Sequence, residues 1–161
     1  MALGDNTLQA ARGNSQRGRN PYMVQMELNL ATALSDKGSA LAASDVIPVI
    51  AVKKGTMILN AGIEVDTASD GSTFTVDLGM VDADVFVDGF DGTSAAAVVA
   101  QNPAAYQPVM AVADDNIDLT IASLSGGAVT TGKMRIWVVM MDCTDQGNDG
   151  TANEVDRDAL A

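Results

Sequence analysis

Residues 133–143 read KMRIWVVMMDC, and this stretch carries the clearest strand pattern of the 161-residue chain. Its side chains alternate between two faces with the period of two that a β-strand imposes. One face holds Met134, Ile136, Val138 and Met140. The other face holds Arg135, Trp137, Val139 and Met141, so it is also rich in apolar side chains. The stretch therefore predicts a strand that is covered on both faces or that lies at a contact between subunits.

Shorter patterns of the same kind occur along the rest of the chain. Tyr22–Leu30 alternates cleanly, which predicts a half-buried strand. Val46–Val52 is a β-branched run interrupted by Pro48, and proline lacks the N–H that a central strand needs, so this strand is expected at an edge or a bulge. Further strands are expected at 57–67, 74–78, 106–112 and 117–121. About eight strands separated by turn signals predict an all-β fold, an antiparallel β-sandwich that is jelly-roll-like.

Three connecting segments give more specific predictions. The sequence Ser69-Asp70-Gly71-Ser72 predicts a hairpin turn, because Asp-Gly tolerates the positive φ angles of tight β-turns. Thr93–Gln101 predicts a short helix, capped at its first residues and ended before Pro103. Ala31–Ser44 contains many alanines and a glycine, so we expect a loop or a turn of weak helix there.

The distribution of charge divides the chain into three parts. Residues 1–20 are polar and glycine-rich, with Arg12, Arg17 and Arg19 against the single acid Asp5. They contain too few apolar side chains to fold alone, so we expect an extended N-terminal arm that gains order by docking on another surface. The β-sandwich domain is expected over 21–145. Residues 146–161 are expected to form an acidic C-terminal tail.

The overall composition argues against several classes of function. The net charge of −12 and the pI near 4.1 disfavour a nucleic-acid partner, since binding to phosphates depends on Lys and Arg. Histidine is absent and Cys143 is the single cysteine, which disfavours His-activated nucleophiles, internal disulfides and zinc. No apolar run resembles a signal peptide or reaches the ~20 residues of a membrane helix. We therefore expect no enzyme, no catalytic residues, no cofactor, no export signal and no membrane partner.

Carboxylates gather in two places that deserve comparison with cation sites. Asp82, Asp84, Asp88 and Asp91 form the densest cluster, and calcium binds through several oxygen ligands. The alternative is that these aspartates line a solvated edge, and we expect no metal there. A second stretch, 145–150 with Asp156, partly imitates a calcium loop but has a glycine where a ligand is needed.

Large apolar side chains give the remaining candidates for contacts. Tyr106 and Trp137 are candidate anchors of a subunit interface, because large aromatics often serve this purpose. The alternative is that Trp137 belongs to the core. The nine methionines are expected to fill irregular gaps in the core.

Several motifs in fixed order resemble the small virion proteins of tailed bacteriophages, specifically the capsid decoration, or cement, protein family. They are an opening MALGDNT followed by LNAGIEVDTA (59–68), TVDLGMVDADVFVDGFDG (75–92), ADDNIDLTI (113–121) and KMRIWVVMMD (133–142). The resemblance spans roughly 57–142 and the first few residues, and it is carried by structural rather than catalytic motifs.

The resemblance implies a homotrimer that lies on the outer capsid surface of the virion and binds the major capsid protein through an extended arm. The side chains expected to make that contact are those of Leu3, Leu8, Arg12, Arg17 and Arg19. The alternatives are a head-fibre base, a tail-associated virion protein, or a calcium- or carbohydrate-binding adhesion module.

Overall fold

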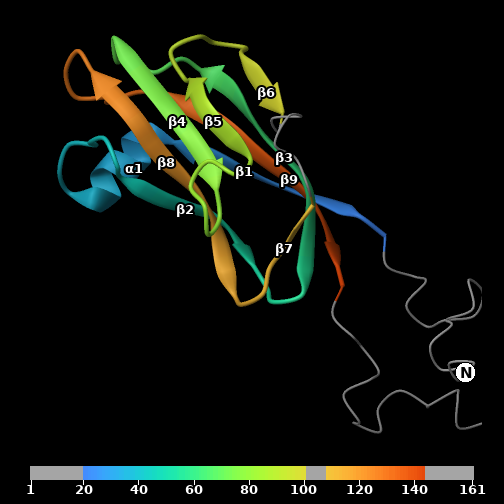
Figure 1. The fold of residues 1–161 in the computed structure, drawn as a ribbon. Helices are drawn as coiled ribbons and strands as arrows, with labels where there is room; N and C mark the ends of the chain where they lie inside the picture. Colours follow the sequence, from blue (N-terminus) through green and yellow to red (C-terminus); the bar gives the residue numbers. More distant parts are fainter. Residues whose placement is uncertain (1–19, 101–107, 144–161) are drawn as a thin grey trace, which may run out of the picture.

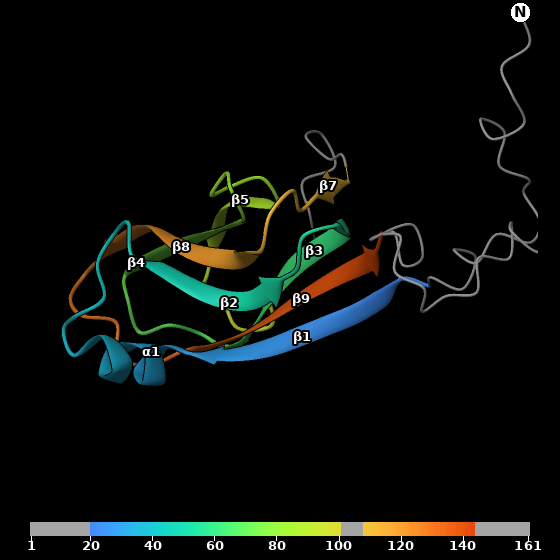
Figure 2. The ribbon, with the colours of Figure 1, turned by 90° about the horizontal axis from the view of Figure 1, so that it is seen from below.

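The computed structural model describes residues 20–100 and 108–143, and these residues form two antiparallel sheets packed face to face (Figures 1 and 2). Sheet A has the order β1-β9-β3-β6, and β7 pairs with the other end of β3. Its strands are β1 (Tyr22–Asn29), β3 (Thr56–Thr67), β6 (Val98–Ala100), β7 (Val109–Met110) and β9 (Lys133–Asp142). Sheet B has the order β2-β8-β4-β5. Its strands are β2 (Val46–Val52), β4 (Thr73–Gly79), β5 (Val87–Asp91) and β8 (Asp115–Ser125).

The chain crosses repeatedly between the two sheets, and this confirms the predicted sandwich. β1, β3, β6 and β9 lie in one layer, while β2, β4, β5 and β8 lie in the other. In both sheets late strands insert between early ones, β9 between β1 and β3, and β8 between β2 and β4. This nested order is that of a jelly roll, with the two-residue strand β7 added at the edge of sheet A.

The core lies between the sheets and follows the alternation of the central strands. In β9 the buried positions are the predicted Met134, Ile136, Val138 and Met140. Sheet B supplies every second residue of β4 and β8 to the same core: Phe74, Val76, Leu78, Ile117, Leu119 and Ile121. Burying each such side chain contributes about 1.5–3 kcal/mol, so the interlayer contact accounts for most of the stabilisation.

β2 is the edge strand that its proline predicts. It pairs only with β8, and its register shifts between Pro48 and Ile50, as in a bulge. Proline therefore falls where the ladder is interrupted, and this edge is a poor template for a further strand.

The predicted hairpin at Ser69–Ser72 is wrong. The strand before this turn, β3, belongs to sheet A, and the strand after it, β4, belongs to sheet B, so the two do not pair. The turn instead carries the chain across the sandwich. Asp70 there accepts hydrogen bonds from the backbone of Thr130 at 2.8 Å and of Thr131 at 3.1 Å, and from the Thr130 hydroxyl. The carboxylate thus joins two loops that lie sixty positions apart in sequence.

The predicted helix from Thr93 is also wrong over the described residues 93–100. Ala96 donates its N–H to the carbonyl of Val65, and Val65 donates to the carbonyl of Ala97. Ala96 has a φ of 61°, which a right-handed helix does not allow. The β-branched pair Val98 and Val99 then continues as β6 along β3. Pairing with an exposed length of β3 overrides the weak local preference for helix.

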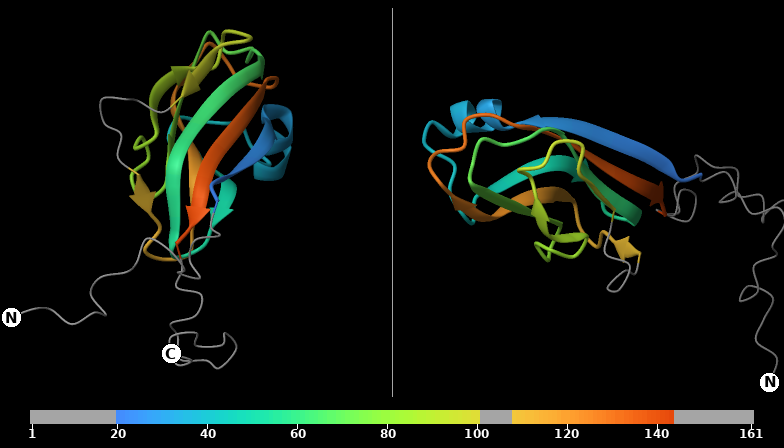
Figure 3. Two further views of the ribbon diagram at one scale, coloured as in Figure 1. Left: turned by 90° about the vertical axis from the view of Figure 1, so that its right-hand side faces the viewer. Right: turned by 90° about the horizontal axis from the view of Figure 1, so that it is seen from above.

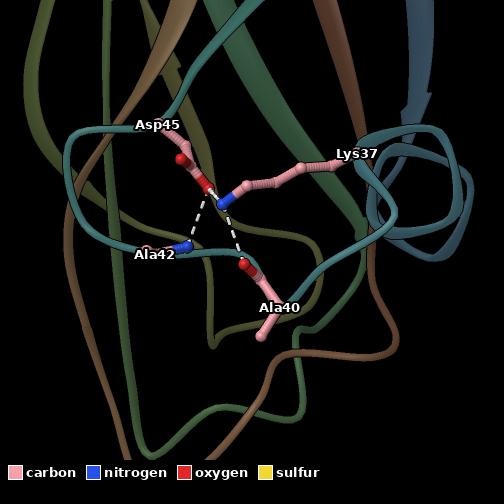
Figure 4. A network of polar contacts seen from close by, with 4 residues as sticks. All are labelled: Lys37, Ala40, Ala42 and Asp45. Atoms are coloured by element: carbon pink, nitrogen blue, oxygen red, sulfur yellow. Dashed lines mark hydrogen bonds and ion pairs between the residues drawn. The ribbon is translucent and has the colours of Figure 1, made fainter.

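The segment 31–44 combines a short helix with a loop, in line with the prediction. The helix α1 (Leu30–Lys37) begins one residue earlier than expected, since Asn29 accepts the N–H of Ala31, and it ends at Gly38 with φ 69°. The loop after it is fixed by Lys37 and Asp45, as Figure 4 shows. Lys37 donates to Asp45 and to the carbonyl of Ala40, while Asp45 accepts the N–H of Ala42.

Both ends of the described chain leave the sandwich at the same end (Figure 3). Tyr22 at the start of β1 lies opposite Met140 near the end of β9. Arg12, Arg17, Arg19, Leu3 and Leu8, together with Tyr106 and the stretch from 144 onward, lie outside the described residues. The predicted boundaries of arm and tail therefore remain predictions. Within 20–100 and 108–143 no helix is long and apolar enough to cross a membrane.

Candidate interaction surfaces

The outer face of sheet A is formed by the side chains that point away from the core. The register places Met23, Gln25 and Glu27 of β1 beside Val139, Trp137 and Arg135 of β9. β3 adds Met57, Gly62 and Glu64 next to β9, and the short strands add Val98, Ala100 and Met110. No second layer of the described chain packs over this face, as the edge-on view of Figure 2 shows.

Trp137 lies at the centre of this face and is half-buried rather than part of the core. Its indole lies against Gly62 of β3. A Cβ added at Gly62 would meet the indole Cζ2 at 2.3 Å and the carbonyl oxygen of Val99 at 2.6 Å. Because Gly62 has no side chain, the indole of Trp137 can pack directly against the backbone of β3. Trp137 faces outward from the sandwich.

The predicted placement of the methionines in the core is wrong for five of the eight that the structure describes. Met134 and Met140 are buried and Met80 packs against the core. Met26 on the edge strand β1 is exposed, and Met23, Met57, Met110 and Met141 lie on the outer face of sheet A. These four lie toward the end of the sheet where the described chain begins and ends. Sequence alternation alone could not assign them, because both faces of the strand 133–142 are apolar.

Charged side chains on the outer face of sheet A occur in pairs of opposite sign. Arg135 Nη1 contacts Glu64 Oε2 at 2.7 Å, and Lys133 Nζ lies 3.3 Å from Glu27 Oε1. These pairs join the three neighbouring strands β1, β9 and β3. They are exposed to solvent and contribute little to stability. Their effect is that the middle of this face is electrically neutral within a strongly acidic chain.

Sheet B has a different outer face. Its four strands contain five acidic residues and no lysine or arginine. Asp118 lies half-buried there, and desolvation, followed by repulsion from Asp115, raises the pKa of its carboxyl above the ordinary value. Neighbouring outward positions are threonines, Thr75 and Thr120. The face is acidic, polar and without bases that would neutralise it.

The four clustered aspartates lie in and around the loop before β5. The Asp82 and Asp84 side chains share a hydrogen bond, which together with their mutual repulsion raises the pKa of Asp82. Asp91 accepts from the hydroxyl and the N–H of Thr93 at 2.7 and 2.8 Å, which lowers the pKa of Asp91. Asp88 lies on β5. Among the described residues no three acidic or cysteine side chains form a group that could hold a metal ion.

A groove of about 580 Å³ runs along the side of the sandwich between the edge strands β1 and β2 and the helix α1. Its apolar lining includes Met26, Leu28, Leu41 and Ile47. The Lys37–Asp45 pair of Figure 4 lies on its rim. The sequence did not predict this groove, because it lies between edge strands of two different sheets, and strand order within a sheet is a tertiary property.

Comparisons with known proteins find similarity in structure and none in sequence. No protein-family model and no curated protein matches the chain. The fold is similar to a chain in the cyanophage Pam1 capsid asymmetric unit, with a TM-score of 0.60 and 16% identity, covering 87% of this chain and 97% of that one. It is also similar to a chain in the capsid of Ralstonia phage GP4, with a TM-score of 0.54 and 15% identity, covering 86% and 94%.

A third similar chain comes from the acidic stable capsid structure of Helicobacter pylori bacteriophage KHP30, with a TM-score of 0.52 and 13% identity, covering 77% of this chain and 89% of that one. At these identities the similarity establishes the shared fold. Each of the three chains is covered almost completely, so the fold of this chain has the extent of a whole chain in each of those capsids.

Proposed function

We propose that this chain is a structural protein of a phage virion that binds the outer surface of the head and stabilises it, as a decoration or cement protein. The observation that carries this proposal is the jelly-roll fold that nearly the whole chain shares with chains of three phage capsid structures. The ordered motifs at 59–68, 75–92, 113–121 and 133–142 also support it.

The chemistry of the chain supports a structural role. It contains no histidine, and the carboxylates of the described part are engaged in turns, ion pairs and solvated faces. The acidic outer face of sheet B is suited to solvent, where like charges keep particles apart. It is unsuited to packaged DNA, whose phosphates it repels.

The mechanism follows from mass action. A protein that binds only the assembled shell shifts the equilibrium toward that shell. The arm, residues 1–20, attaches at the end of the sandwich where β1 begins, and in this proposal Leu3, Leu8, Arg12, Arg17 and Arg19 contact the major capsid protein. In a homotrimer three arms act together, because the second and third bind at a high effective concentration.

The test uses phage heads that lack the protein. Full-length protein, a chain without residues 1–20, and a variant with Arg12, Arg17 and Arg19 all changed to Gln are added to such heads, and bound copies are counted. The Gln variant keeps the length of the arm and serves as the matched control for charge. We expect full occupancy for the full chain, salt-sensitive loss for the Gln variant and the lowest occupancy for the truncation.

Two results would contradict the proposal. Full occupancy by the truncated chain would exclude the arm as the contact. Failure of the full-length protein to bind heads, with binding to tails or fibres instead, would assign it to a head-fibre base or a tail-associated role.

A further inference from the structure

We propose that the outer face of sheet A is the interface through which copies of this chain associate. The proposal concerns which face associates. The number of copies, three, rests on the proposed function and requires different parts of this face to meet around a threefold axis, since a face that meets itself gives a dimer. The exposed side chains and the charges of the described residues support the interface itself.

The outer face of sheet A leaves large apolar side chains uncovered. Met23 is 60% exposed, Val98 is 61% exposed and Met110 is 39% exposed, and all three point outward from the same sheet. Between them lie Trp137 and Val139, which no layer of the described chain covers. Methionine and tryptophan are enriched in interface cores because they are large and, for methionine, adaptable in shape. Exposed apolar side chains gathered on one face in this way mark a site of protein contact.

The charges on this face identify its occupant as a second copy of the chain. A chain with a net charge of −12 repels its own copies through any surface that carries unmatched carboxylates. On the outer face of sheet A, Glu27 is matched by Lys133 and Glu64 by Arg135. The two ion pairs leave the middle of this face without net charge to oppose a second copy, and the exposed Asp66 lies near the end of β3, beyond these pairs.

The other surfaces of the sandwich fit a second copy less well. The outer face of sheet B carries Asp77 and Asp118 on its central strands β4 and β8, and the strands of sheet B contain no lysine or arginine, so two copies would repel each other there. At the edge of sheet B, Pro48 and the bulge of β2 block pairing with a further strand. The groove beside β1 is rimmed by Glu27, Asp36 and Asp45 against the single base Lys37. The outer face of sheet A is the described surface that combines apolar exposure with balanced charge.

The test is sedimentation velocity on the full-length protein over a wide range of concentration, without heads. A double variant, Met23→Glu with Val98→Glu, places new carboxylates on the proposed interface. The matched control, Val46→Glu with Val81→Glu, also adds two carboxylates, at valines that are 56% and 83% exposed on β2 of sheet B and in the loop between β4 and β5. Thermal melts establish that both variants are folded.

We expect the wild type and the control to associate to the same extent, and the Met23/Val98 variant to associate about tenfold more weakly or not at all. Trp137 is the only tryptophan, so its fluorescence gives a second readout. Its emission should shift to shorter wavelength as the wild-type concentration rises, because association removes water from the indole, and it should stay constant in the Met23/Val98 variant.

The outcomes separate this proposal from the proposed function. A wild type that stays monomeric overturns the interface, and so does a Met23/Val98 variant that associates as well as the control. If a monomeric wild type binds phage heads and the Met23/Val98 variant does not, the outer face of sheet A contacts the capsid shell and not a second copy. Association lost in the variant supports the interface even if the wild type then fails to bind heads, a result that would overturn the proposed function alone.

Discussion

The two outer faces of this sandwich differ although both belong to antiparallel sheets around one core. The outer face of sheet A carries a tryptophan, four methionines and two ion pairs. The outer face of sheet B carries threonines and unmatched aspartates. Neither difference is needed to form the core, which both sheets fill with the same kinds of aliphatic side chain. The comparison teaches that one fold can present two unlike surfaces, and the proposed contacts, protein for sheet A and solvent for sheet B, account for the difference.

The largest expected effect separates the inner and outer faces of sheet A. Ile136→Ala removes a fully buried side chain from β9 and should lower the free energy of unfolding by about 2–5 kcal/mol. Met23→Ala, on the outer face of the neighbouring strand, should change it by about 0.5 kcal/mol or less. Urea denaturation of both variants measures the contrast. A comparable loss in Met23→Ala would mean that the outer face of sheet A serves the fold rather than a partner.

The second prediction concerns the contact between Gly62 and the indole of Trp137. Gly62→Ala places a methyl group inside the contact with Trp137 and should cost about 1–3 kcal/mol through overpacking. The displaced indole becomes more exposed, so its emission should shift to longer wavelength. In a Trp137→Val background the same substitution should cost less, although the carbonyl of Val99 still limits the space. An unchanged emission spectrum would contradict the packing of the indole on Gly62.

Sequence alone predicted the parts of the fold that depend on local pattern. The alternation in 133–142 gave the buried residues of β9, and Pro48 gave an edge strand with a bulge. The Asp70-Gly71 hairpin failed because pairing is a tertiary property: the same turn residues serve a crossing between sheets. The helix at Thr93 failed because β3 is longer than its partners and recruits Val98 and Val99. The outer methionines were missed because a strand that is apolar on both faces does not reveal which face is covered.

The third prediction tests a carboxylate that stabilises the fold. Hydrogen bonds from Thr130 and Thr131 lower the pKa of Asp70 from 3.8 to about 2. Because the folded pKa lies below the unfolded one, the stabilisation is complete above about pH 4 and is lost as the pH falls toward 2. Asp70→Asn should therefore lower the melting temperature at pH 7 and flatten its decline between pH 4 and 2. Identical pH profiles for variant and wild type would remove this role from Asp70.

The fourth and smallest effect has the opposite sign and concerns the outer face of sheet B. Burial raises the pKa of Asp118, so its charged form is disfavoured in the folded state. The penalty is present at neutral pH and disappears as the pH falls below the folded and then the unfolded pKa. Asp118→Asn should slightly raise the melting temperature at pH 7 and leave it unchanged near pH 2. If Asp118→Asn instead melts at a lower temperature than the wild type at pH 7, the charged carboxylate of Asp118 stabilises the fold, and the prediction is contradicted.

The most direct measurement is a cryo-electron microscopy reconstruction of phage heads that carry this protein, at a resolution that separates strands. The account predicts that the face of Met23, Trp137 and Val98 lies against protein density. It also predicts that Asp77 and Asp118 on sheet B face solvent outside the shell. A map with the aspartate face against protein and the tryptophan face in open solvent would contradict it.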